Sequence, residues 1–333
     1  MSSYCTYVDI NYLPRLIALL GSIRKFDKDS KIFVLFLDEE SLKQGTRIFG
    51  EDVHPISLME IESCYPELSQ AKSNRSAMEY VFTLTPYLMR LVLGRIKENE
   101  LAVYLDADLF FMGPPELVIN DLAEADVGII PHHYPEKLAN SMAKYGQFNV
   151  GWVAIRNSTS GMSCATWWAE RCLENCDDEP QGGRYADQGY LDQFPDLFGG
   201  VKVLENRGFN LAPWNTSGQV IDVDPQGRLR LGDDTQLTFF HFHGLKRFGK
   251  WMVTSQLNYK SPSTKPLMEL VYKPYLRALQ RAEKALEKQA SGRPIQKLVR
   301  GKGLRKWART LSGKLLMVAS VLTGNAVDMS KLK

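Results

Sequence analysis

Long apolar runs are missing from this 333-residue chain. The longest one near its end covers residues 315–322, well short of the roughly 20 apolar residues that a membrane-spanning helix needs. The first residues also lack the basic segment and following apolar segment that are typical of secretory signals. We therefore expect a cytoplasmic protein.

Cysteine is scarce and shows no framework spacing. Of the five cysteines, only Cys172 and Cys176 are close enough in sequence to share one face of a helix. A metal-binding pair is one interpretation, but no second Cys or His pair with zinc-like spacing lies nearby. Reduced thiols of a cytosolic protein are the better interpretation.

Glycine-rich phosphate loops are absent as well. No Gly-x-Gly-x-x-Gly follows the first predicted strand, and there is no phosphate-cradling Gly-x-x-x-x-Gly-Lys-Ser/Thr loop. The Gly-x-Ser-x-Gly nucleophile elbow is also missing. If the protein recognises phosphate groups, a metal ion and basic side chains must do so.

The first half of the chain alternates between predicted strands and helices. Strands are expected over residues 4–8, 31–37, 52–56 and 101–105, and helices over 13–26, 41–49 and 77–96, the last with a break at Pro86. The less regular second half has strands expected at 127–130, 148–155 and 239–244, and helices at 164–175, around 185–194 and at 265–290. This order predicts an α/β protein with a Rossmann-like, mostly parallel central sheet flanked by helices, with ligands at the carboxyl ends of its strands.

Two carboxylates follow the apolar strand predicted over 101–105. Asp106 and Asp108 are one residue apart, and apolar residues resume directly after them. An unpaired carboxylate is costly in an apolar interior, and two neighbouring carboxylates repel each other. A divalent cation such as Mg²⁺ or Mn²⁺ resolves both difficulties. A simple acidic turn is the alternative interpretation.

Haloacid-dehalogenase-type phosphatases also carry Asp-x-Asp at the end of a strand. That family has Thr or Val two places after the second Asp, where this chain has Phe110. In that family the first Asp also lies close to the N-terminus, whereas in this chain the corresponding residue is Asp106. Both differences count against a phosphatase.

The paired Asp residues belong to a set of motifs that resembles another family. Asp106-Ala-Asp108 is similar to the Asp-x-Asp motif of GT-A-fold glycosyltransferases, which use sugar nucleotides, and the resemblance is strongest to glycosyltransferase family 8. The other matching elements are Thr85-Pro-Tyr-Leu-Met-Arg90, Phe148-Asn149-Val-Gly151, Ala186-Asp187-Gln188 and His241-Phe-His-Gly244. In order and spacing the resemblance covers residues 4 to about 251.

The resemblance implies a role for each matched residue. Asp106 would contact the ribose and the metal, Asp108 would ligate the metal, and His241 would be the third ligand. One imidazole with two carboxylates suits Mn²⁺ better than Mg²⁺, although a structural histidine is the alternative. The other implied nucleotide-sugar contacts are Thr6, Tyr7, Asp9, Arg90, Asn149, Gly244, Lys246 and Arg247.

The chain departs from the family after Gly244. The family has Lys-Pro-Trp there, whereas this chain continues with Leu, Lys246 and Arg247, so either basic residue is a candidate for binding the diphosphate. Arg90 is expected to support the phosphates or to fix a loop through a salt bridge.

Other histidines follow predicted strands. His243 is expected on the side of its strand opposite to His241, where it faces the acceptor or packs. His132 and His133 are acceptor-side or exposed, and exposure is the favoured interpretation.

The resemblance also implies transfer with retention of anomeric configuration. The leaving diphosphate gains negative charge, which a metal with Lys or Arg stabilises. Asp187 and Gln188 are the predicted catalytic residues. Retention can use a carboxylate nucleophile, but Gln cannot fill that covalent role. We therefore expect same-face attack by the acceptor hydroxyl, with Asp187 orienting the sugar.

Charge is unevenly distributed along the chain. Residues 288–333 hold eleven Lys and Arg residues against Asp328 alone, although the whole chain has a net charge of only +3. Within 294–322, leucines and Trp307 lie among the basic residues, a pattern typical of contact with an anionic membrane surface. Nucleic acid is a rival partner that the acidic body argues against, and a solvated tail is the third interpretation.

These features predict three segments and one activity. Residues 1–260 are expected to form a GT-A domain, 261–291 a helical extension and 292–333 a basic amphipathic tail. The predicted enzyme transfers a sugar from a nucleotide diphosphate, UDP foremost, to a saccharide or lipid-linked acceptor, with peripheral contact at the inner face of the membrane. An Asp-x-Asp phosphatase or nucleotidyltransferase, and a non-catalytic carbohydrate-binding homologue, are the alternatives.

Overall fold

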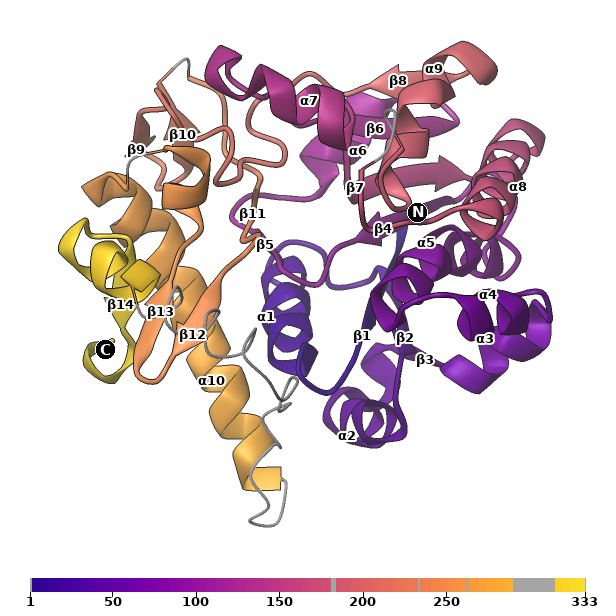
Figure 1. The fold of residues 1–333 in the computed structure, drawn as a ribbon, viewed down its shortest axis with the longest axis horizontal. Helices are drawn as coiled ribbons and strands as arrows, with labels where there is room; N and C mark the ends of the chain where they lie inside the picture. Colours follow the sequence, from indigo (N-terminus) through magenta and orange to yellow (C-terminus); the bar gives the residue numbers. More distant parts are fainter. Residues whose placement is uncertain (1, 181–183, 233, 262, 290–314, 333) are drawn as a thin grey trace.

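A seven-stranded sheet lies at the centre of the computed structural model, which describes residues 2–180, 184–232, 234–261, 263–289 and 315–332. The strand order is β3-β2-β1-β4-β7-β6-β8. The strands are β1 (Ser2–Val8), β2 (Lys31–Phe36), β3 (His54–Ser57), β4 (Leu101–Leu105), β6 (Val127–Pro131), β7 (Phe148–Arg156) and β8 (Val201–Val203). All except β7 run in the same direction, which confirms the predicted mostly parallel sheet (Figure 1).

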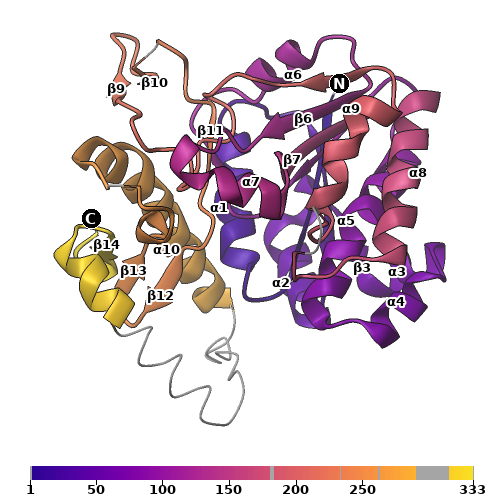
Figure 2. The same cartoon turned by 45° about the horizontal axis from the view of Figure 1, so that its top comes forward.

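Helices cover both faces of this sheet, because strand side chains point alternately to either side. Val34 and Val103 pack on one face with α1 (Leu13–Ile23), α2 (Glu39–Phe49) and α6 (Glu116–Leu122). Leu35 and Tyr104 pack on the other face with α3 (Leu58–Cys64), α4 (Leu68–Asn74), α5 (Ala77–Leu93) and α8 (Thr159–Glu174). Figure 2 shows the sheet between these two layers. The predicted α/β fold is therefore confirmed.

Helix α5 passes through Pro86 without a break, so the predicted interruption is wrong. The helix begins after Ser76, which forms a capping box with Glu79. Pro86 is buried, and α5 packs against α8 and β4. That packing outweighs the roughly 3 kcal/mol that a proline costs inside a helix.

The antiparallel strand β7 begins at the edge where its neighbours end. The backbone N–H of Asp106, just after β4, donates to the carbonyl of Gly151 at 2.9 Å. On the other side, Ile129 pairs with Val153 but Ile130 pairs with Asn149, so β7 bulges between them. The bulge brings Asn149 and Gly151 to the carboxyl edge beside Asp106.

A second group of elements packs beside the central sheet (Figures 1 and 2). It contains β5 (Leu109–Phe111) paired with β11 (Phe239–His241), and a sheet of β12 (Lys246–Phe248), β13 (Trp251–Val253) and β14 (Ala326–Asp328). The helix predicted over 265–290 divides into a π-helix (Leu267–Tyr272) and α10 (Lys273–Gln289), which packs against α1. Phe240, Phe242 and Tyr275 lie in the core of this group.

Shorter elements complete the described chain. They are η1 (Gly50–Asp52), η2 (Glu136–Leu138), α7 (Ala139–Tyr145), η3 (Gln188–Gln193), α9 (Phe194–Leu197), β9 (Ile221–Val223), β10 (Leu229–Leu231), η4 (Gln256–Tyr259) and η6 (Met329–Lys331). The helix predicted around 185–194 thus forms as η3 and α9.

The end of the predicted tail joins the second group of elements, because β14 pairs with β13 and places Val327 opposite Met252. Trp307 and the other tail residues from 290 to 314 lie outside the described residues. Within the described ranges, no helix is both long and apolar enough to cross a bilayer. Cys172 and Cys176 are buried, and both are free thiols.

Candidate active site

The Asp pair lies at the carboxyl edge of the central sheet, in the turn that joins β4 to β5. β5 turns away from the sheet and pairs with β11, so that Leu109 lies opposite His241. The backbone N–H of Phe242 donates to the carbonyl of Asp108 at 2.9 Å. This pairing brings a histidine from late in the chain against both carboxylates.

The side chains of Asp106, Asp108 and His241 converge. Nε2 of His241 lies 3.1 Å from Oδ1 of Asp108 and 3.6 Å from Oδ2 of Asp106. The candidate ligand atoms all lie within 4.8 Å of one another. Ligands about 2.1 Å from an octahedral cation lie roughly 3 Å apart in adjacent positions. Two carboxylates and one imidazole are also a donor set that suits Mn²⁺. These residues therefore fit a divalent cation, whose identity stays a prediction.

A network of side-chain amides orients His241. Oδ1 of Asn149 lies 3.2 Å from Nδ1 of His241 and accepts a hydrogen bond from Asn210 at 3.0 Å. Nδ2 of Asn149 donates to Oε1 of Gln188 at 2.9 Å, and Gln188 in turn donates to the carbonyl of Tyr145. An imidazole whose Nδ1–H donates to an amide oxygen presents the Nε2 lone pair to a metal. Gln188 thus supports the ligand through Asn149.

His241 and the two carboxylates compensate one another's charge. Burial alone would lower the pKa of His241, but Asp108 and Asp106 raise it above its usual value. Burial would raise the pKa of Asp108, yet the His241 imidazolium lowers it well below its usual range. For Asp106, burial dominates and raises the pKa. With both carboxylates ionised, the cluster has two negative charges against at most one positive charge, which favours a cation.

Gly151 on β7 leaves the space that the His241 ring occupies. A Cβ atom at this position would lie 2.8 Å from Cε1 of His241 and 2.7 Å from Oδ1 of Asn149. A larger residue would displace one of these side chains, because close-packed groups do not tolerate such contacts. The glycine of the Phe-Asn-x-Gly motif is therefore a steric requirement of this site.

Gly151→Ala is expected to lower the free energy of unfolding by about 1–3 kcal/mol through overpacking. It is also expected to abolish the rise in melting temperature that Mn²⁺ causes, because the His241 ring moves. Differential scanning fluorimetry with and without Mn²⁺ measures both effects. Gly21→Ala is the matched control, since a Cβ on that helical residue meets no atom within 4 Å. An undiminished Mn²⁺ response in Gly151→Ala would contradict the steric role.

Asp187 is buried beside the Asp pair, directly before η3. Its carbonyl accepts a hydrogen bond from the indole of Trp168 at 2.9 Å, whereas its Oδ2 has no partner among the residues that the structure describes. Burial raises the pKa of Asp187 to about 7, and the nearby charge of Asp106 acts in the same direction. A buried carboxyl oxygen without a partner in the protein indicates a group positioned for a ligand.

The residues predicted to contact the nucleotide lie at the end of β1, next to the Asp pair. The Tyr7 ring packs against Tyr104, whose hydroxyl donates to Asp106 at 2.9 Å. Thr6 is buried, and its hydroxyl has no partner in the described ranges. Asp9 accepts a hydrogen bond from the backbone three residues later and so fixes the loop after β1. Their contacts with a nucleotide stay predictions.

Arg90 stacks on aromatic rings instead of reaching the Asp pair. Its guanidinium lies 4.8 Å from the ring centre of Tyr65 and 5.6 Å from that of Tyr87. Within the described part of the chain we find no salt bridge of Arg90. A contact between Arg90 and the phosphates stays a prediction.

Both basic candidates for the diphosphate follow the turn after β11 and are neighbours in β12. Gly244 has a φ of +71°, in the left-handed region that favours glycine. Beyond it, Arg247 forms an ion pair with Glu283 of α10 at 2.6 Å. Lys246 is also exposed. Because neighbouring residues of a strand point to opposite faces, Lys246 points away from the Arg247–Glu283 pair.

The favoured exposure of His132 and His133 is wrong, and so is the predicted side of His243. His132 is 3% exposed, because the indole of Trp214 donates to its carbonyl and covers its ring. The side chain of His133 is only 13% exposed. His243 lies on the same side as His241, with ring centres 5.8 Å apart, because side chains two positions apart share one face of a strand.

Arg15 is a cationic side chain beside the site that sequence reasoning missed. It stacks on Tyr12 at 4.4 Å, donates to the carbonyl of Leu245 at 3.1 Å and interacts electrostatically with Asp108. Its Nε has no partner among the described residues. No sequence signal distinguished it, since a basic residue in the first turn of a helix ordinarily faces solvent.

Trp214 was also missed. Its ring packs edge-on against both His241 and His243, with ring centres 5.3 and 5.6 Å away. The run around Trp214 matches no motif considered in the sequence, and only the fold places it over the cluster.

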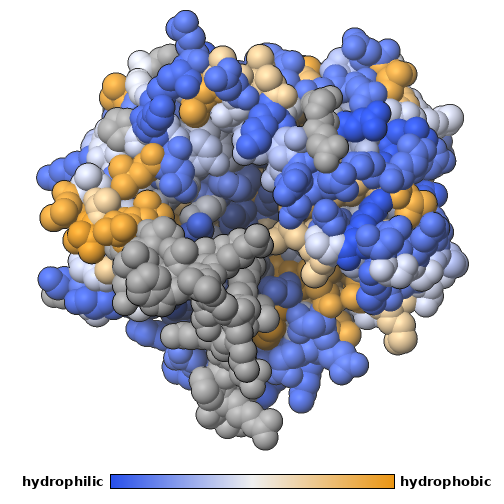
Figure 3. All heavy atoms as spheres, viewed as in Figure 1, coloured by the Kyte–Doolittle hydropathy of each residue, from blue (hydrophilic) through white to orange (hydrophobic). Residues whose placement is uncertain are grey.

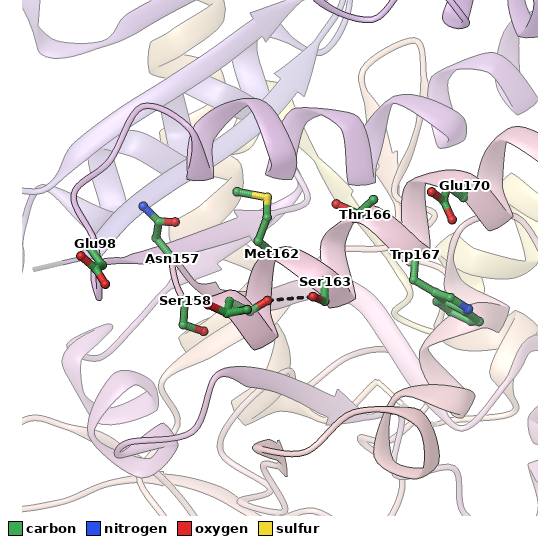
Figure 4. Close-up of a pocket in the computed structure, with 9 residues that line it drawn as sticks. Glu98, Asn157, Ser158, Met162, Ser163, Thr166, Trp167 and Glu170 are labelled. Atoms are coloured by element: carbon green, nitrogen blue, oxygen red, sulfur yellow. Dashed lines mark hydrogen bonds between the residues drawn. The ribbon is translucent and has the colours of Figure 1, made fainter.

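Two surface features are separated by the sheet. Figure 3 shows a hollow lined by hydrophilic residues near the centre of the molecule, where β5 and β11 lie in Figure 1. A groove of about 660 Å³ follows α8 and includes Asn157, Ser158 and Trp167 (Figure 4). Because Arg156 at the end of β7 pairs with Leu101 at the start of β4, the groove begins at the edge opposite to the Asp pair.

Comparisons with known proteins find relatives of this chain in Bacillus subtilis. No family model matches it. It is 32% identical over 254 residues to the uncharacterized protein YfnF of Bacillus subtilis (strain 168), covering 74% of this chain and 82% of YfnF. It is 28% identical over 284 residues to YfnD of the same organism, covering 84% and 88%.

Solved structures agree with this fold. The bifunctional glycosyltransferase WbbM aligns with a TM-score of 0.50 and 13% identity, over 86% of this chain and 51% of WbbM. The galactosyltransferase LgtC, solved with donor and acceptor sugar analogues, aligns with a TM-score of 0.48 and 17% identity, over 84% and 95%. The likeness to WbbM confirms the predicted GT-A type of fold, whereas membership of family 8 stays a prediction.

Proposed function

We propose that this chain, which belongs to the same protein family as YfnF of Bacillus subtilis, is a metal-dependent glycosyltransferase. Its donor is a nucleotide-diphosphate sugar, UDP-linked by preference, and its acceptor is a saccharide. The observation that carries the proposal is the convergence of Asp106, Asp108 and His241 at the carboxyl edge of a glycosyltransferase-type sheet. Ligands of such sheets bind at this edge.

Asp106, Asp108 and His241 would hold Mn²⁺ or Mg²⁺. When bound, the cation compensates the negative charge of the diphosphate that leaves the sugar. Asn149 keeps the Nε2 atom of His241 directed at the two carboxylates. Arg15, whose Nε has no partner within the described residues, supplies further positive charge beside Asp108.

Asp187 is the group that we assign to the sugar. Its buried Oδ2, which has no partner among the described residues, can accept hydrogen bonds from sugar hydroxyls and so hold the ring in position. Both ends of the Gln188 side-chain amide are already hydrogen-bonded, the oxygen to Asn149 and the nitrogen to the carbonyl of Tyr145. This division supports retention through same-face attack by the acceptor hydroxyl rather than a covalent intermediate on Gln188.

Lys246 is expected to bind the diphosphate, because it is exposed and has no ion pair among the described residues, whereas Arg247 is paired with Glu283. Lys246→Met should raise the KM for the sugar nucleotide about tenfold, as expected for the loss of one charge-assisted contact of about 1.4 kcal/mol. Steady-state kinetics of UDP release measure the change. Arg247→Met is the matched control and should change KM less than twofold. Equal effects of the two substitutions would contradict the assignment.

A hydrolysis assay tests the proposed reaction. The chain is incubated with a panel of UDP- and GDP-sugars with and without Mn²⁺, and the free nucleotide is quantified. A glycosyltransferase releases nucleotide slowly from its own donor, and only with the metal. Phosphate release from p-nitrophenyl phosphate would identify a phosphatase instead. Binding of a sugar nucleotide without any turnover, even with saccharides added, would identify a non-catalytic homologue.

A lipid-linked acceptor at the inner face of the membrane is the finer form of this proposal. In the helix over 315–322, Leu315, Val318 and Leu322 are exposed on one stripe. In the sequence this helix directly follows the basic residues of the tail. An apolar stripe beside a basic segment supports peripheral contact with anionic lipid.

A further inference from the structure

Four half-buried tyrosines surround the side of the site that faces away from β1. We call Tyr134, Tyr145, Tyr185 and Tyr259 the tyrosine rim. They come from four separate segments: the loop after β6, the end of α7, the loop before η3 and the end of η4. The pKa values of Tyr134, Tyr185 and Tyr259 are each raised in part by the charge that another rim hydroxyl would carry on losing its proton, so these hydroxyl groups lie near one another.

Two of the rim residues reach the metal cluster through aromatic contacts. Tyr134 stacks on His132 with ring centres 4.5 Å apart and planes 11° apart, and His132 packs against Trp214. Tyr259 lies 5.9 Å from Trp214. Trp214 in turn packs against His241. One side chain therefore separates Tyr259 from this candidate ligand, and two side chains separate Tyr134 from it.

The other two rim residues adjoin the predicted catalytic pair. The ring centres of Tyr145 and Tyr185 lie 5.0 Å apart. The carbonyl of Tyr145 accepts a hydrogen bond from Gln188 at 2.7 Å. Tyr185 interacts electrostatically with Asp187, two residues later. The rim therefore reaches the metal cluster through Trp214 on one side and lies near Asp187 on the other.

The strand order places the tyrosine rim opposite to the donor residues. In the order β1-β4-β7-β6, the Asp pair follows β4. Thr6, Tyr7 and Asp9 end β1 on one side of it, whereas Tyr134 follows β6 on the other. A molecule held at the rim would thus approach the donor sugar across the metal cluster, on the path that an acceptor must take.

The chemistry of the rim favours a saccharide. Half-buried tyrosine rings offer an apolar face together with a hydrogen-bonding hydroxyl, and burial raises the pKa of Tyr259 to about 12, so its hydroxyl stays neutral. Two lysines near the rim are engaged: Lys137 donates to Ser217 and to the carbonyl of Lys260 at 2.8 Å, and Lys144 lies over the Tyr145 ring. Neutral hydroxyls and ring faces match the alternating CH and OH groups of a sugar better than they match a phosphate.

We propose that the tyrosine rim is the acceptor site and that it binds a saccharide by stacking on Tyr134 and Tyr259. This assignment rests on the proposed glycosyl transfer, because a bound saccharide is an acceptor only in that reaction. Saccharide binding at the rim is itself independent of turnover, so it can be measured separately.

A glycan array probed with the labelled full chain, in the presence of UDP and Mn²⁺, tests the proposal. We expect binding to at least one saccharide class, and a loss of at least about tenfold in affinity for that saccharide in Tyr134→Leu and Tyr259→Leu. Leucine keeps most of the side-chain volume but removes the ring face and the hydroxyl. Melting temperatures of the variants verify that they fold.

Trp167→Leu is the matched control, because Trp167 is a half-buried aromatic residue in the groove along α8 whose ring contacts Tyr190, Phe194 and Phe198. It should bind the array like the original chain. Unchanged binding in both tyrosine variants, loss of binding only in Trp167→Leu, or no bound saccharide at all would each overturn the proposal. Glycan binding without any metal-dependent release of nucleotide would support saccharide binding at the rim but refute the transferase function.

Discussion

Replacing Asp108 with Asn is expected to lower metal-dependent release of nucleotide from the sugar donor by about a thousandfold. The substitution keeps the shape of the side chain but removes a charged ligand that lies 3.1 Å from His241. Losing one electrostatic group at a developing charge typically costs 10²–10³-fold, and weaker metal binding adds to this. Steady-state kinetics at several Mn²⁺ concentrations separate the lower metal affinity from the lower rate.

The same variant should no longer respond to Mn²⁺ in a melting experiment, because a ligand that binds the folded state raises apparent stability. Asp196→Asn on α9 is the matched control, since that carboxylate is exposed and far along the chain from the cluster. It should behave like the original protein in both assays. Full activity of Asp108→Asn would contradict a catalytic cation at this site.

Asp187→Asn is expected to have opposite effects on stability and on activity. Without metal, at pH 8, the variant should be more stable than the original chain, because it removes a buried carboxylate whose Oδ2 has no partner among the described residues. Transfer and donor hydrolysis should nevertheless fall by about 10²–10³-fold, since the amide neither carries the charge nor offers the second acceptor oxygen that orients the sugar.

The stability effect has a defined pH dependence. Burial raises the pKa of Asp187 from 3.8 to about 7 in the folded protein. The folded state therefore holds this proton more tightly than the unfolded state does, and stability is lost as the pH rises from about 4 to about 7. A pKa difference of this size corresponds to at most on the order of 4 kcal/mol above pH 7. Below about pH 4, where the original side chain is a neutral acid, the stability advantage of the Asp187→Asn variant should disappear.

Urea unfolding of both proteins at pH 4, 6 and 8 in the presence of EDTA measures this difference. Asp222→Asn, an exposed carboxylate on β9, is the control and should show no pH-dependent gain. A loss of stability in Asp187→Asn at pH 8 would mean that the native carboxylate has a stabilising partner. Retained activity would remove Asp187 from the proposed mechanism.

The central sheet and the metal cluster could be predicted from the sequence because their signals are local. An apolar run that ends in Asp106 and Asp108 marks both a strand and its carboxyl edge, and the parallel order of the strands follows from their alternation with helices. His241 was linked to the pair by motif order. The structure supplies the physical reason, which is the antiparallel pairing of β5 with β11.

Features that depend on long-range packing were not predictable in the same way. His132 is buried because Trp214, more than eighty residues later, donates to its carbonyl and covers its ring. Arg15 lies near Asp108 because α1 packs beside β5, an arrangement that periodicity does not reveal. Pro86 stays inside α5 because the packing of that helix outweighs a local preference that the sequence displays clearly.

The position of His243 was a different kind of error. Side chains two residues apart on a strand share a face, so the sequence already implied that His243 lies with His241. In the structure both rings contact Trp214, and the His243 ring also contacts Tyr259.

Anomalous diffraction from crystals of the full chain grown with Mn²⁺ and UDP would test the metal site most directly. We predict one strong manganese peak in contact with the carboxylates of Asp106 and Asp108 and with Nε2 of His241, together with diphosphate oxygens of UDP. A map without a peak among these three side chains, or with UDP bound elsewhere, would contradict the proposed site and with it the proposed reaction.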